Sequence, residues 1–301
     1  MTRILGARKT RSDRIFDVVV GVLCFIFLII AAYPLYLVVI ASISDPTAVS
    51  QGKVLFVPVG FSLRGYNYIF QNRDIWTGYA NTILYTVCGT AGGTMVTLLA
   101  AYASSRSDLP GRGIFIKLAL FTMFFNGGMI PTYLVMKNLN LTNTRLILIL
   151  MGMFICYNMI IARTFFATNI PKELLEAAFI DGCGNIRFFF SIVMPLSKAI
   201  IAVIALYIGI QYWNGYFTAL IYVTKRDLFP LQLILREILV LGQTLSQGGE
   251  GMDVEAIVEM QKISEAIKYG VIIVSMLPVM LVYPFIQKYF VQGVMIGSVK
   301  G

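Results

Sequence analysis

The stretch EAAFIDGCGNIRFFFSIVMP, residues 176–195, separates two long apolar runs and decides how this chain is organised. It gathers two carboxylates, two glycines and a proline within twenty residues. Charged side chains are costly inside lipid, and glycine and proline commonly end helices. The stretch therefore predicts a polar elbow that stands outside a membrane, between two apolar spans.

The composition indicates that the solvent of this protein is a bilayer. Of 301 residues, 58% are hydrophobic and 13% are charged, with a mean hydropathy of +0.79. A soluble domain carries about 25% charged residues. Because no run alternates polar and apolar residues as barrel strands do, the chain is predicted to be an all-α integral membrane protein.

Six apolar segments are long enough to cross a hydrocarbon core, which takes about 20 residues. Four of them come before the predicted elbow loop, 168–197, and two come after it. Together they divide the chain into four predicted regions. Residues 1–14 form a cytoplasmic segment, 15–80 the first helix and an external loop, 81–290 the membrane core, and 291–301 a cytoplasmic tail. The predicted spans are 15–42, 82–104, 114–136, 145–167, 198–222 and 270–290.

The distribution of basic residues predicts the orientation. Fourteen of the 24 Lys and Arg residues fall on the side of the amino terminus and the elbow loop. Lys and Arg favour the cytoplasmic side, so both termini are expected there, in a multi-pass protein of the cytoplasmic membrane. The first span is too long for the apolar part of a cleaved signal peptide and is interpreted as an uncleaved anchor.

Several kinds of chemistry are not expected in this chain. It has no histidine, its four cysteines show no ligand spacing, and it lacks the glycine-rich phosphate loop G-x-x-x-x-G-K-[ST]. No catalytic or metal site is predicted, and ATP and magnesium would have to bind a partner chain. The net charge of +9 is explained by a cytoplasmic rim facing membrane lipid, so no nucleic acid is expected.

The elbow itself is predicted as two short helices joined at glycine. Asn169 is placed to cap a first helix over 171–181, with Pro171 in its first turn, where a missing N–H is harmless. Gly182 supplies the left-handed conformation that ends this helix. A second stretch, 186–194, is expected to begin with Asn185 as its cap and to end at Pro195.

The spacing of these residues resembles a signature of the permease subunits of ABC importers: E-A-A, three residues, G, nine residues, I-x-L-P. Here Glu176, Ala177 and Ala178 precede Gly182 at that spacing, and Met194 stands where leucine is usual, a change that keeps size and apolarity. The resemblance implies a type I importer permease fold. Its cytoplasmic coupling helix would contact an ATPase dimer through Glu176, Ala177, Ala178, Asp181 and Gly182.

Other stretches resemble the oligosaccharide branch of these importers, particularly the second permease of maltose-type and aldouronate or multiple-sugar systems. They are NGGMIPTYLVMKNLNLTNT (126–144), QYWNGYF (211–217), PLQLILREIL (230–239) and YFVQGVMIGSVKG (289–301). The resemblance implies a different permease as partner, an external sugar-binding protein and an oligosaccharide substrate. It also suggests Lys300 and Gly301 as a second contact with the ATPase, although a frayed end would look the same.

An acidic region lies between the fifth and sixth spans. Apolar residues recur every three or four positions from Leu231 to Leu241, which predicts an amphipathic helix. In maltose-type importers the matching loop enters the binding protein, and the resemblance implies that the tip here is Gly248, Gly249, Glu250 and Gly251.

A polar stripe in the fifth span is a candidate substrate path. Tyr207, Gln211, Asn214 and Thr218 fall within about 40° of one line on a helical wheel. Polar groups in a membrane either bond a neighbouring helix or line a cavity, and both readings remain open here. Aromatic and amide groups at similar depth complete the candidate set, namely Tyr157, Asn158, Trp213 and Tyr216.

Glycines outside the elbow are interpreted as structural. Gly89, Gly92 and Gly93 are expected to allow close helix packing, and Gly127 and Gly128 to break the third span. Two alternatives remain for function. One is an ABC permease for a solute other than a sugar. The other is an ATP-independent transporter or channel, although no acidic residue falls within spans two to six.

Overall fold

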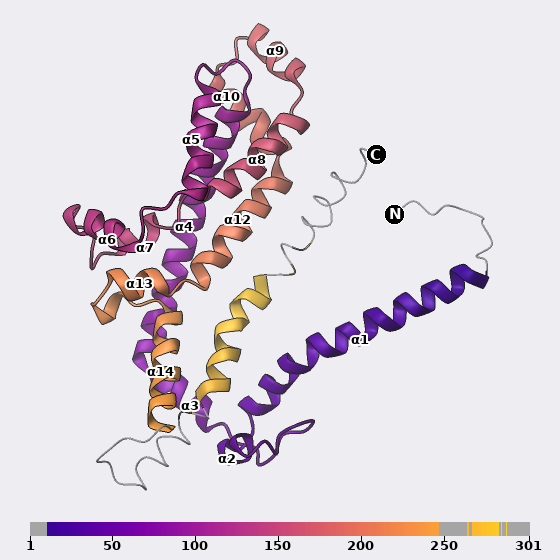
Figure 1. The fold of residues 1–301 in the computed structure, drawn as a ribbon, viewed down its shortest axis with the longest axis vertical. Coiled ribbons are helices and arrows are strands. Elements are labelled where there is room, and N and C mark those ends of the chain that lie inside the picture. Colours follow the sequence, from indigo (N-terminus) through magenta and orange to yellow (C-terminus); the bar gives the residue numbers. More distant parts are fainter. Residues whose placement is uncertain (1–10, 247–263, 265–266, 283, 285–286, 288–301) are drawn as a thin grey trace. The chain divides into compact units, whose positions relative to one another are not determined.

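The computed structural model describes residues 11–246, 264, 267–282, 284 and 287. These residues contain helices and no strand, which confirms the all-α prediction (Figure 1). The chain divides into two compact units. One combines Met1–Gln71 with Ile238–Val274, and the other combines Asn72–Glu237 with Ser275–Gly301.

The first unit begins with the long apolar helix α1 (Arg11–Ser42), which covers the first predicted span. It is followed by α2 (Pro46–Ser50) and α3 (Arg64–Gln71). Asp45 caps α2 by accepting hydrogen bonds from the backbone N–H groups of Thr47 at 2.9 Å and Ala48 at 3.3 Å. A carboxylate is favourable at the positive end of a helix, so Asp45 fixes the residue at which α2 begins.

Three helices form the core of the second unit: α4 (Arg73–Ser105), α8 (Cys156–Asn169) and α12 (Lys198–Trp213). Three glycines of α4 allow close packing, as predicted, because a methyl group on any of these glycines would overlap a neighbouring residue. Lipid tails are as apolar as leucine, so such close packing stabilises helix pairs in membranes. The contacts are Gly89 with the Tyr212 ring, Gly92 with the Met153 side chain, and Gly93 with the Met153 carbonyl.

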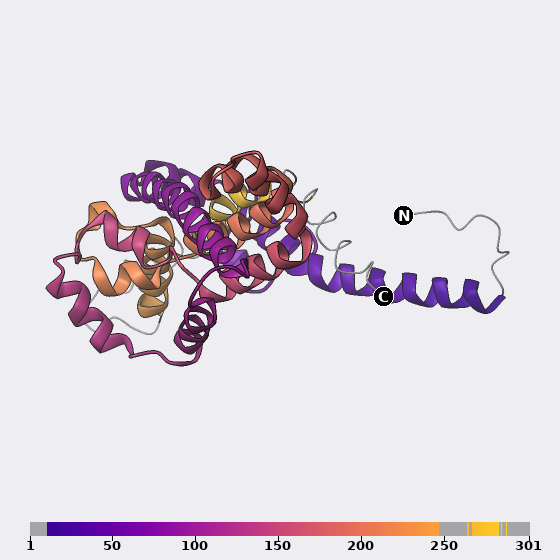
Figure 2. The ribbon, with the colours of Figure 1, turned by 90° about the horizontal axis from the view of Figure 1, so that it is seen from above.

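The third predicted span is broken, as its glycines indicated. Helix α5 (Arg112–Phe124) and helix α6 (Met129–Asn138) meet at an angle of 114°. Gly128 lies between them with φ +90°, a conformation that favours glycine. Figure 2 shows how this bend carries α6 away from α5.

The fourth and fifth predicted spans are interrupted as well. The fourth divides into α7 (Arg145–Leu150) and α8, and the fifth into α12 and α13 (Phe217–Tyr222). In the fifth, Asn214 and Gly215 close α12 by donating backbone hydrogen bonds to the carbonyls of Ile210 and Tyr212. Hydropathy cannot register such a break, because the residues on both sides are apolar.

The predicted amphipathic helix is confirmed as α14 (Leu231–Ser246), and a further helix covers Ile267–Val282. Among the described residues, two helices, α1 and α4, are long and apolar enough to cross a membrane singly, and up to four spans result if each bent pair counts as one. Helices lie in all six predicted spans, while the number of crossings stays a prediction.

Candidate coupling elbow and polar pocket

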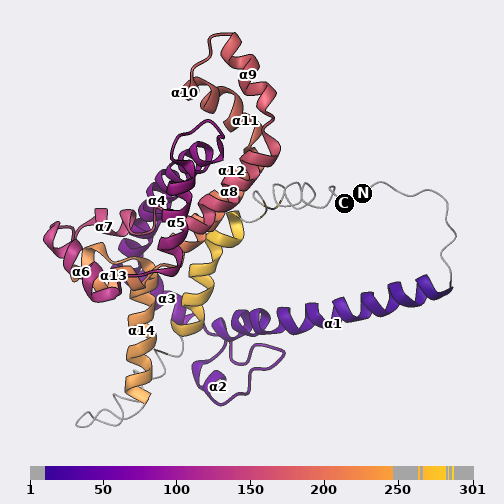
Figure 3. The ribbon, with the colours of Figure 1, turned by 45° about the horizontal axis from the view of Figure 1, so that its top comes forward.

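The elbow forms at one end of the second unit, beyond the carboxyl end of α4 (Figures 1 and 3). Its first helix is α9 (Lys172–Ile180), within one residue of the predicted 171–181. Gly182 has φ +75°, which confirms it as the left-handed stop. The turn is closed by backbone hydrogen bonds from Gly182 to the Phe179 carbonyl at 3.0 Å and from Cys183 to the Ala178 carbonyl at 2.8 Å.

The start of α9 differs from the prediction. Asn169 is the last residue of α8 rather than a cap of α9, and its side-chain amide donates to the Phe165 carbonyl at 3.0 Å. Pro171 takes the cap position, with extended backbone angles, and makes no side-chain cap bond. The sequence interpretation was wrong because a residue two positions before a proline can equally well close the preceding helix.

The second half of the elbow also differs from the prediction. Helix α10 (Asn185–Phe188) continues through a π-helical turn, η1 (Phe189–Val193), into α11 (Met194–Leu196). Pro195 therefore does not end the helix, and the bend of 87° comes after Leu196. Pro195 follows the π-helical turn directly, so it lies where the regular hydrogen-bond ladder of the α-helix is already interrupted.

Asn185 does not cap α10, whose cap residue is Gly184. Its side-chain oxygen instead accepts a hydrogen bond from the Arg106 guanidinium at 2.8 Å. The π-helical turn is closed by the Met194 amide, which donates to the Phe189 carbonyl five residues earlier. Such turns are rare in helices and frequent at functional sites.

The predicted coupling residues of α9 are placed on two sides of the helix. Glu176, Ala177, Asp181 and Gly182 are exposed, whereas Ala178 is only 7% exposed and packs into the protein. Ala178 is therefore a packing residue rather than part of the open surface. The remaining predicted contacts, Lys300, Gly301, Gly248, Gly249, Glu250 and Gly251, lie outside the described residues.

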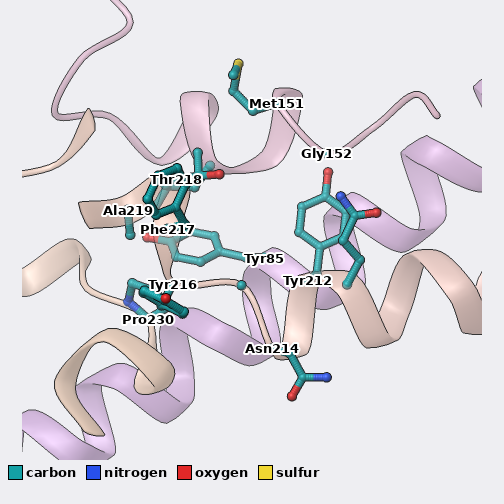
Figure 4. A pocket seen from close by; sticks show the side chains of 13 residues that line it. Tyr85, Met151, Gly152, Tyr212, Asn214, Tyr216, Phe217, Thr218, Ala219 and Pro230 are labelled. Atoms are coloured by element: carbon teal, nitrogen blue, oxygen red, sulfur yellow. The ribbon is translucent and has the colours of Figure 1, made fainter. Parts of the chain in front are cut away.

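A pocket of about 200 Å³ opens where α12 breaks before α13 (Figure 4). Its wall includes two tyrosines whose hydroxyls are committed to the backbone. Tyr212 donates to the Ile149 carbonyl, and Tyr85 donates to the Leu228 carbonyl at 2.9 Å. The complete lining is Tyr85, Leu148, Met151, Gly152, Gln211, Tyr212, Asn214, Gly215, Tyr216, Phe217, Thr218, Ala219 and Pro230.

Four of the eight predicted path residues line this pocket: Gln211, Asn214, Tyr216 and Thr218. The other four do not. Tyr157 and Tyr207 are exposed, and Asn158 is 3% exposed, with its Nδ2 atom lacking a hydrogen-bond partner in the described part of the chain. Trp213 is buried and donates to the Ser275 carbonyl at 3.1 Å, so it serves helix packing.

Sequence reasoning missed several lining residues, notably Tyr85, Gly152 and Tyr212. Tyr212 directly follows Gln211, but it lies off the predicted wheel line, and Tyr85 belongs to another span. The stretch QYWNGYF offered the signal, because an Asn-Gly pair within an apolar run marks a turn. Interpreting the Asn-Gly pair as a helix break would have predicted an interruption of the fifth span at the pocket.

A cation also lies at the Tyr216 side of the pocket. The guanidinium of Arg236, on α14, lies 5.6 Å from the centre of the Tyr216 ring, and Tyr216 lines the pocket. Its neighbour Arg226 is instead paired with Asp74 at 2.6 Å and Glu237 at 3.3 Å. The Asp74 carboxylate also raises the pKa of Arg226. Arg226 is thus committed to structure, whereas Arg236 keeps an exposed cation next to an aromatic wall.

The segment before α14 is held firmly to α4. Asn81 donates from its amide to the carbonyls of Asp227 at 2.7 Å and Phe229 at 3.1 Å. The Thr82 hydroxyl accepts from the Leu231 amide at 2.8 Å. Asn81 and Thr82 are almost fully buried, so these bonds fix the pocket's floor at Pro230 to α4.

The apolar helices and the helix–glycine–helix elbow at one end of the bundle fit a membrane permease. The chain belongs to the family described as binding-protein-dependent transport system inner membrane component, which matches residues 3–296. The resemblance seen in the elbow motif is thereby confirmed.

Several known proteins are similar to this chain over nearly its whole length. The chain is 40% identical over 290 residues to the polygalacturonan/rhamnogalacturonan transport system permease protein YtcP of Bacillus subtilis, covering 96% of this chain and all of that protein. It is 36% identical over 306 residues to Protein LplC of the same organism, covering all of both chains. In a crystal structure of a bacterial ABC transporter for import of the acidic polysaccharide alginate, one chain matches with a TM-score of 0.81 and 34% identity, covering 95% of this chain and all of that one.

Proposed function

We propose that this chain is one of two different permeases in an ATP-driven importer. An external binding protein delivers an oligosaccharide, and the paired permeases open alternately to the two sides of the cytoplasmic membrane. An ATPase dimer, which holds ATP and magnesium, drives this motion, while the present chain performs no hydrolysis. The elbow is cytoplasmic in this proposal, as are both termini.

The observation that carries the proposal is the elbow within a chain of this family. Helix α9 presents the exposed carboxylate of Glu176, and nothing lies within 4 Å of where a side chain at Gly182 would start. A short helix of this kind fits a groove on a partner, and its carboxylate suits a basic partner residue. The terminal residues Lys300 and Gly301 are proposed as a second contact with the ATPase.

The pocket supports a sugar as the transported solute. Amide groups of Gln211 and Asn214 suit hydroxyl groups, and the Tyr216 ring suits the apolar face of a pyranose. Its volume of about 200 Å³ is smaller than the ~300–1,000 Å³ typical of ligand pockets. It therefore holds part of an oligosaccharide, and the second permease supplies the rest of the path.

An acidic sugar fits this pocket better than a neutral one. Arg236 offers a guanidinium at the Tyr216 wall, and guanidinium groups bind carboxylates in a bidentate manner. The relatives named for polygalacturonan and alginate transport point in the same direction. We therefore favour uronic-acid oligosaccharides as the cargo.

The first experiment measures ATPase activity of the purified complex in lipid, with and without its binding protein. The solute panel is trigalacturonate, an alginate trimer, maltotriose and glycerol 3-phosphate, and Glu176→Lys is compared with wild type. We expect stimulation by the acidic sugars in wild type, and its loss in Glu176→Lys because a repulsive charge then faces the ATPase. Lys172→Ala, an exposed change at the start of the same helix, is the control.

The outcomes separate the alternatives. A permease of sn-glycerol 3-phosphate transport, UgpE of Pectobacterium atrosepticum, is 27% identical over 296 residues, so stimulation by glycerol 3-phosphate alone would favour a non-sugar solute. Solute movement with no ATPase bound would overturn the importer proposal in favour of an ATP-independent transporter. Unchanged stimulation in Glu176→Lys would remove Glu176 from the coupling contact.

A further inference from the structure

A largely covered arginine joins the elbow to the longest helix of the second unit. Arg106 follows the last residue of α4, and its side chain is only 10% exposed. The guanidinium donates from Nη1 to the side-chain oxygen of Asn185, at the start of α10, over 2.8 Å. It also lies 5.4 Å from the centre of the Phe179 ring on α9. One side chain thus contacts both helices of the elbow.

The same guanidinium is anchored on the α4 side. It donates to the Tyr102 hydroxyl at 3.1 Å and to both carboxylate oxygens of Asp108, from Nε at 2.8 Å. The Asp108 carboxylate raises the pKa of Arg106, and Arg106 lowers the pKa of Asp108, so both groups are charged at neutral pH. The planar guanidinium of Arg106 holds Asp108 in a bidentate manner and still donates to Tyr102 and Asn185, four bonds that the three donors of a lysine cannot reproduce.

Aromatic packing surrounds this contact. The Tyr102 ring lies 5.1 Å from the ring of Phe189 and 6.4 Å from that of Phe188, both of which are nearly fully buried. A second arginine, Arg163 of α8, donates to the Ser104 carbonyl at 3.2 Å. The carboxyl end of α4 is therefore held to the elbow by polar and aromatic contacts together.

Helix α4 also reaches the pocket. Tyr85 lines the pocket and Tyr102 contacts Arg106, and 17 residues of helix separate them, which is about 25 Å at 1.5 Å per residue. An uninterrupted helix is a stiff connection between two sites. A displacement of the elbow can reach the pocket through α4 only if the elbow and α4 move together.

We propose that Arg106 is the positioning residue that locks the coupling elbow to α4, so that movement of α9 and α10 is transmitted to the pocket. This role rests on the proposed importer function. Arg106 touches neither solute nor nucleotide. Its removal would leave an elbow that still binds the ATPase but moves without carrying α4 along.

The test measures solute transported per ATP hydrolysed, using the complete complex in proteoliposomes with its binding protein and trigalacturonate as the probe. In Arg106→Ala we expect basal ATPase activity within about twofold of wild type. The transport-to-ATP ratio should fall on the order of tenfold, within the 5–150-fold range typical of coupling between sites. Lys117→Ala, which removes an exposed cation of neighbouring α5, should keep the wild-type ratio.

Variants of Asn185 separate this role from a general effect on folding, because Asn185 is exposed. Asn185→Leu should lower the ratio roughly threefold, while Asn185→Asp should retain it, since a carboxylate also accepts from Arg106. Combined with Arg106→Ala, Asn185→Leu should add no further loss. If the complex with Arg106→Ala does not assemble, the transport-to-ATP ratio of Asn185→Leu alone tests the role of Arg106.

A wild-type ratio in Asn185→Leu, or independent losses in the double variant, would overturn the role of Arg106. If the wild-type complex shows no stimulation by any solute of the panel, the importer function itself fails, and the proposed role falls with it. A coupled wild type with unaffected Arg106 and Asn185 variants contradicts only the present inference.

Discussion

The elbow and the pocket both depend on glycine, but for opposite reasons. At the elbow, Gly182 has φ +75° and no atom within 4 Å of where a side chain would start. Gly152, which lines the pocket, and Gly89, behind the pocket-lining Tyr212, lack the positive φ of Gly182, and a side chain on either would run into the ring of Tyr212. Gly182 is required by its backbone conformation, whereas Gly89 and Gly152 are required because Tyr212 leaves no room for a side chain.

The two sites should therefore respond differently to substitution of their glycines. A conformational requirement is local, so replacing Gly182 should alter the angle of the elbow and leave the helix bundle intact. A packing requirement is shared, so replacing Gly89 should disturb Tyr212 and, with it, the pocket wall. The elbow is thus separable from the fold, and the pocket is part of it.

The largest functional effect is expected for Gly182→Val. A β-branched residue is a strong outlier at positive φ, so the elbow should change its angle, and transport should fall by at least roughly tenfold with the complex still soluble in detergent. Transport of trigalacturonate into proteoliposomes measures this. Gly182→Asn is the matched control, since asparagine adopts the left-handed region more readily. Equal transport in both variants and wild type would contradict the local requirement.

Gly89→Ala tests the other half of the comparison. The added methyl would overlap the Tyr212 ring, and overpacking of this kind typically costs about 1–3 kcal/mol. We expect a lower unfolding temperature of the detergent-solubilised complex. Gly113→Ala is the control, because nothing lies within 4 Å of Gly113. A wild-type unfolding temperature in Gly89→Ala would show that Tyr212 has room to move.

Asn214→Leu sharpens the assignment of the pocket to solute. Leucine keeps the size of asparagine but removes the amide, so hydrogen bonds to sugar hydroxyls are lost at about 0.5–1.5 kcal/mol each. The KM for transport should rise several-fold, and the unfolding temperature should fall only slightly, because the substitution also removes the exposed bond from Asn214 Nδ2 to the Ile210 carbonyl at 3.0 Å. Tyr207→Phe, outside the pocket, should leave the KM unaltered. A changed unfolding temperature with an unchanged KM would assign Asn214 to structure.

The smallest effect is expected for Arg236→Gln, and it should be selective. Exposed charge contacts contribute about 0.2–1 kcal/mol, so the KM for trigalacturonate should rise about twofold to fivefold, with maltotriose unaffected. The difference should shrink at high salt, because salt screens exposed charges. Equal effects on both sugars would argue against recognition of a carboxylate by Arg236.

Much of the elbow could be predicted because its determinants are local. The helix over 171–181 and its stop at Gly182 follow from residue types at fixed offsets, and the structure differs by one residue at each end. The roles of Asn169 and Pro195 were predicted wrongly. Asparagine can close one helix as well as cap the next, and proline can lie inside a helix as well as end it.

The apolar helical class, the elbow and its family could be predicted from the order of residues alone, because hydropathy, glycine and a spaced motif act over short distances. Which residues meet across the chain depends on the folded structure. The Arg106 guanidinium finds Asn185 across 79 residues, and Tyr85 and Tyr212 face one pocket from different helices. Such meetings depend on the bends after Phe124 and Leu196 and on the break at Asn214, where packing and backbone hydrogen bonding prevail over a uniform apolar pattern.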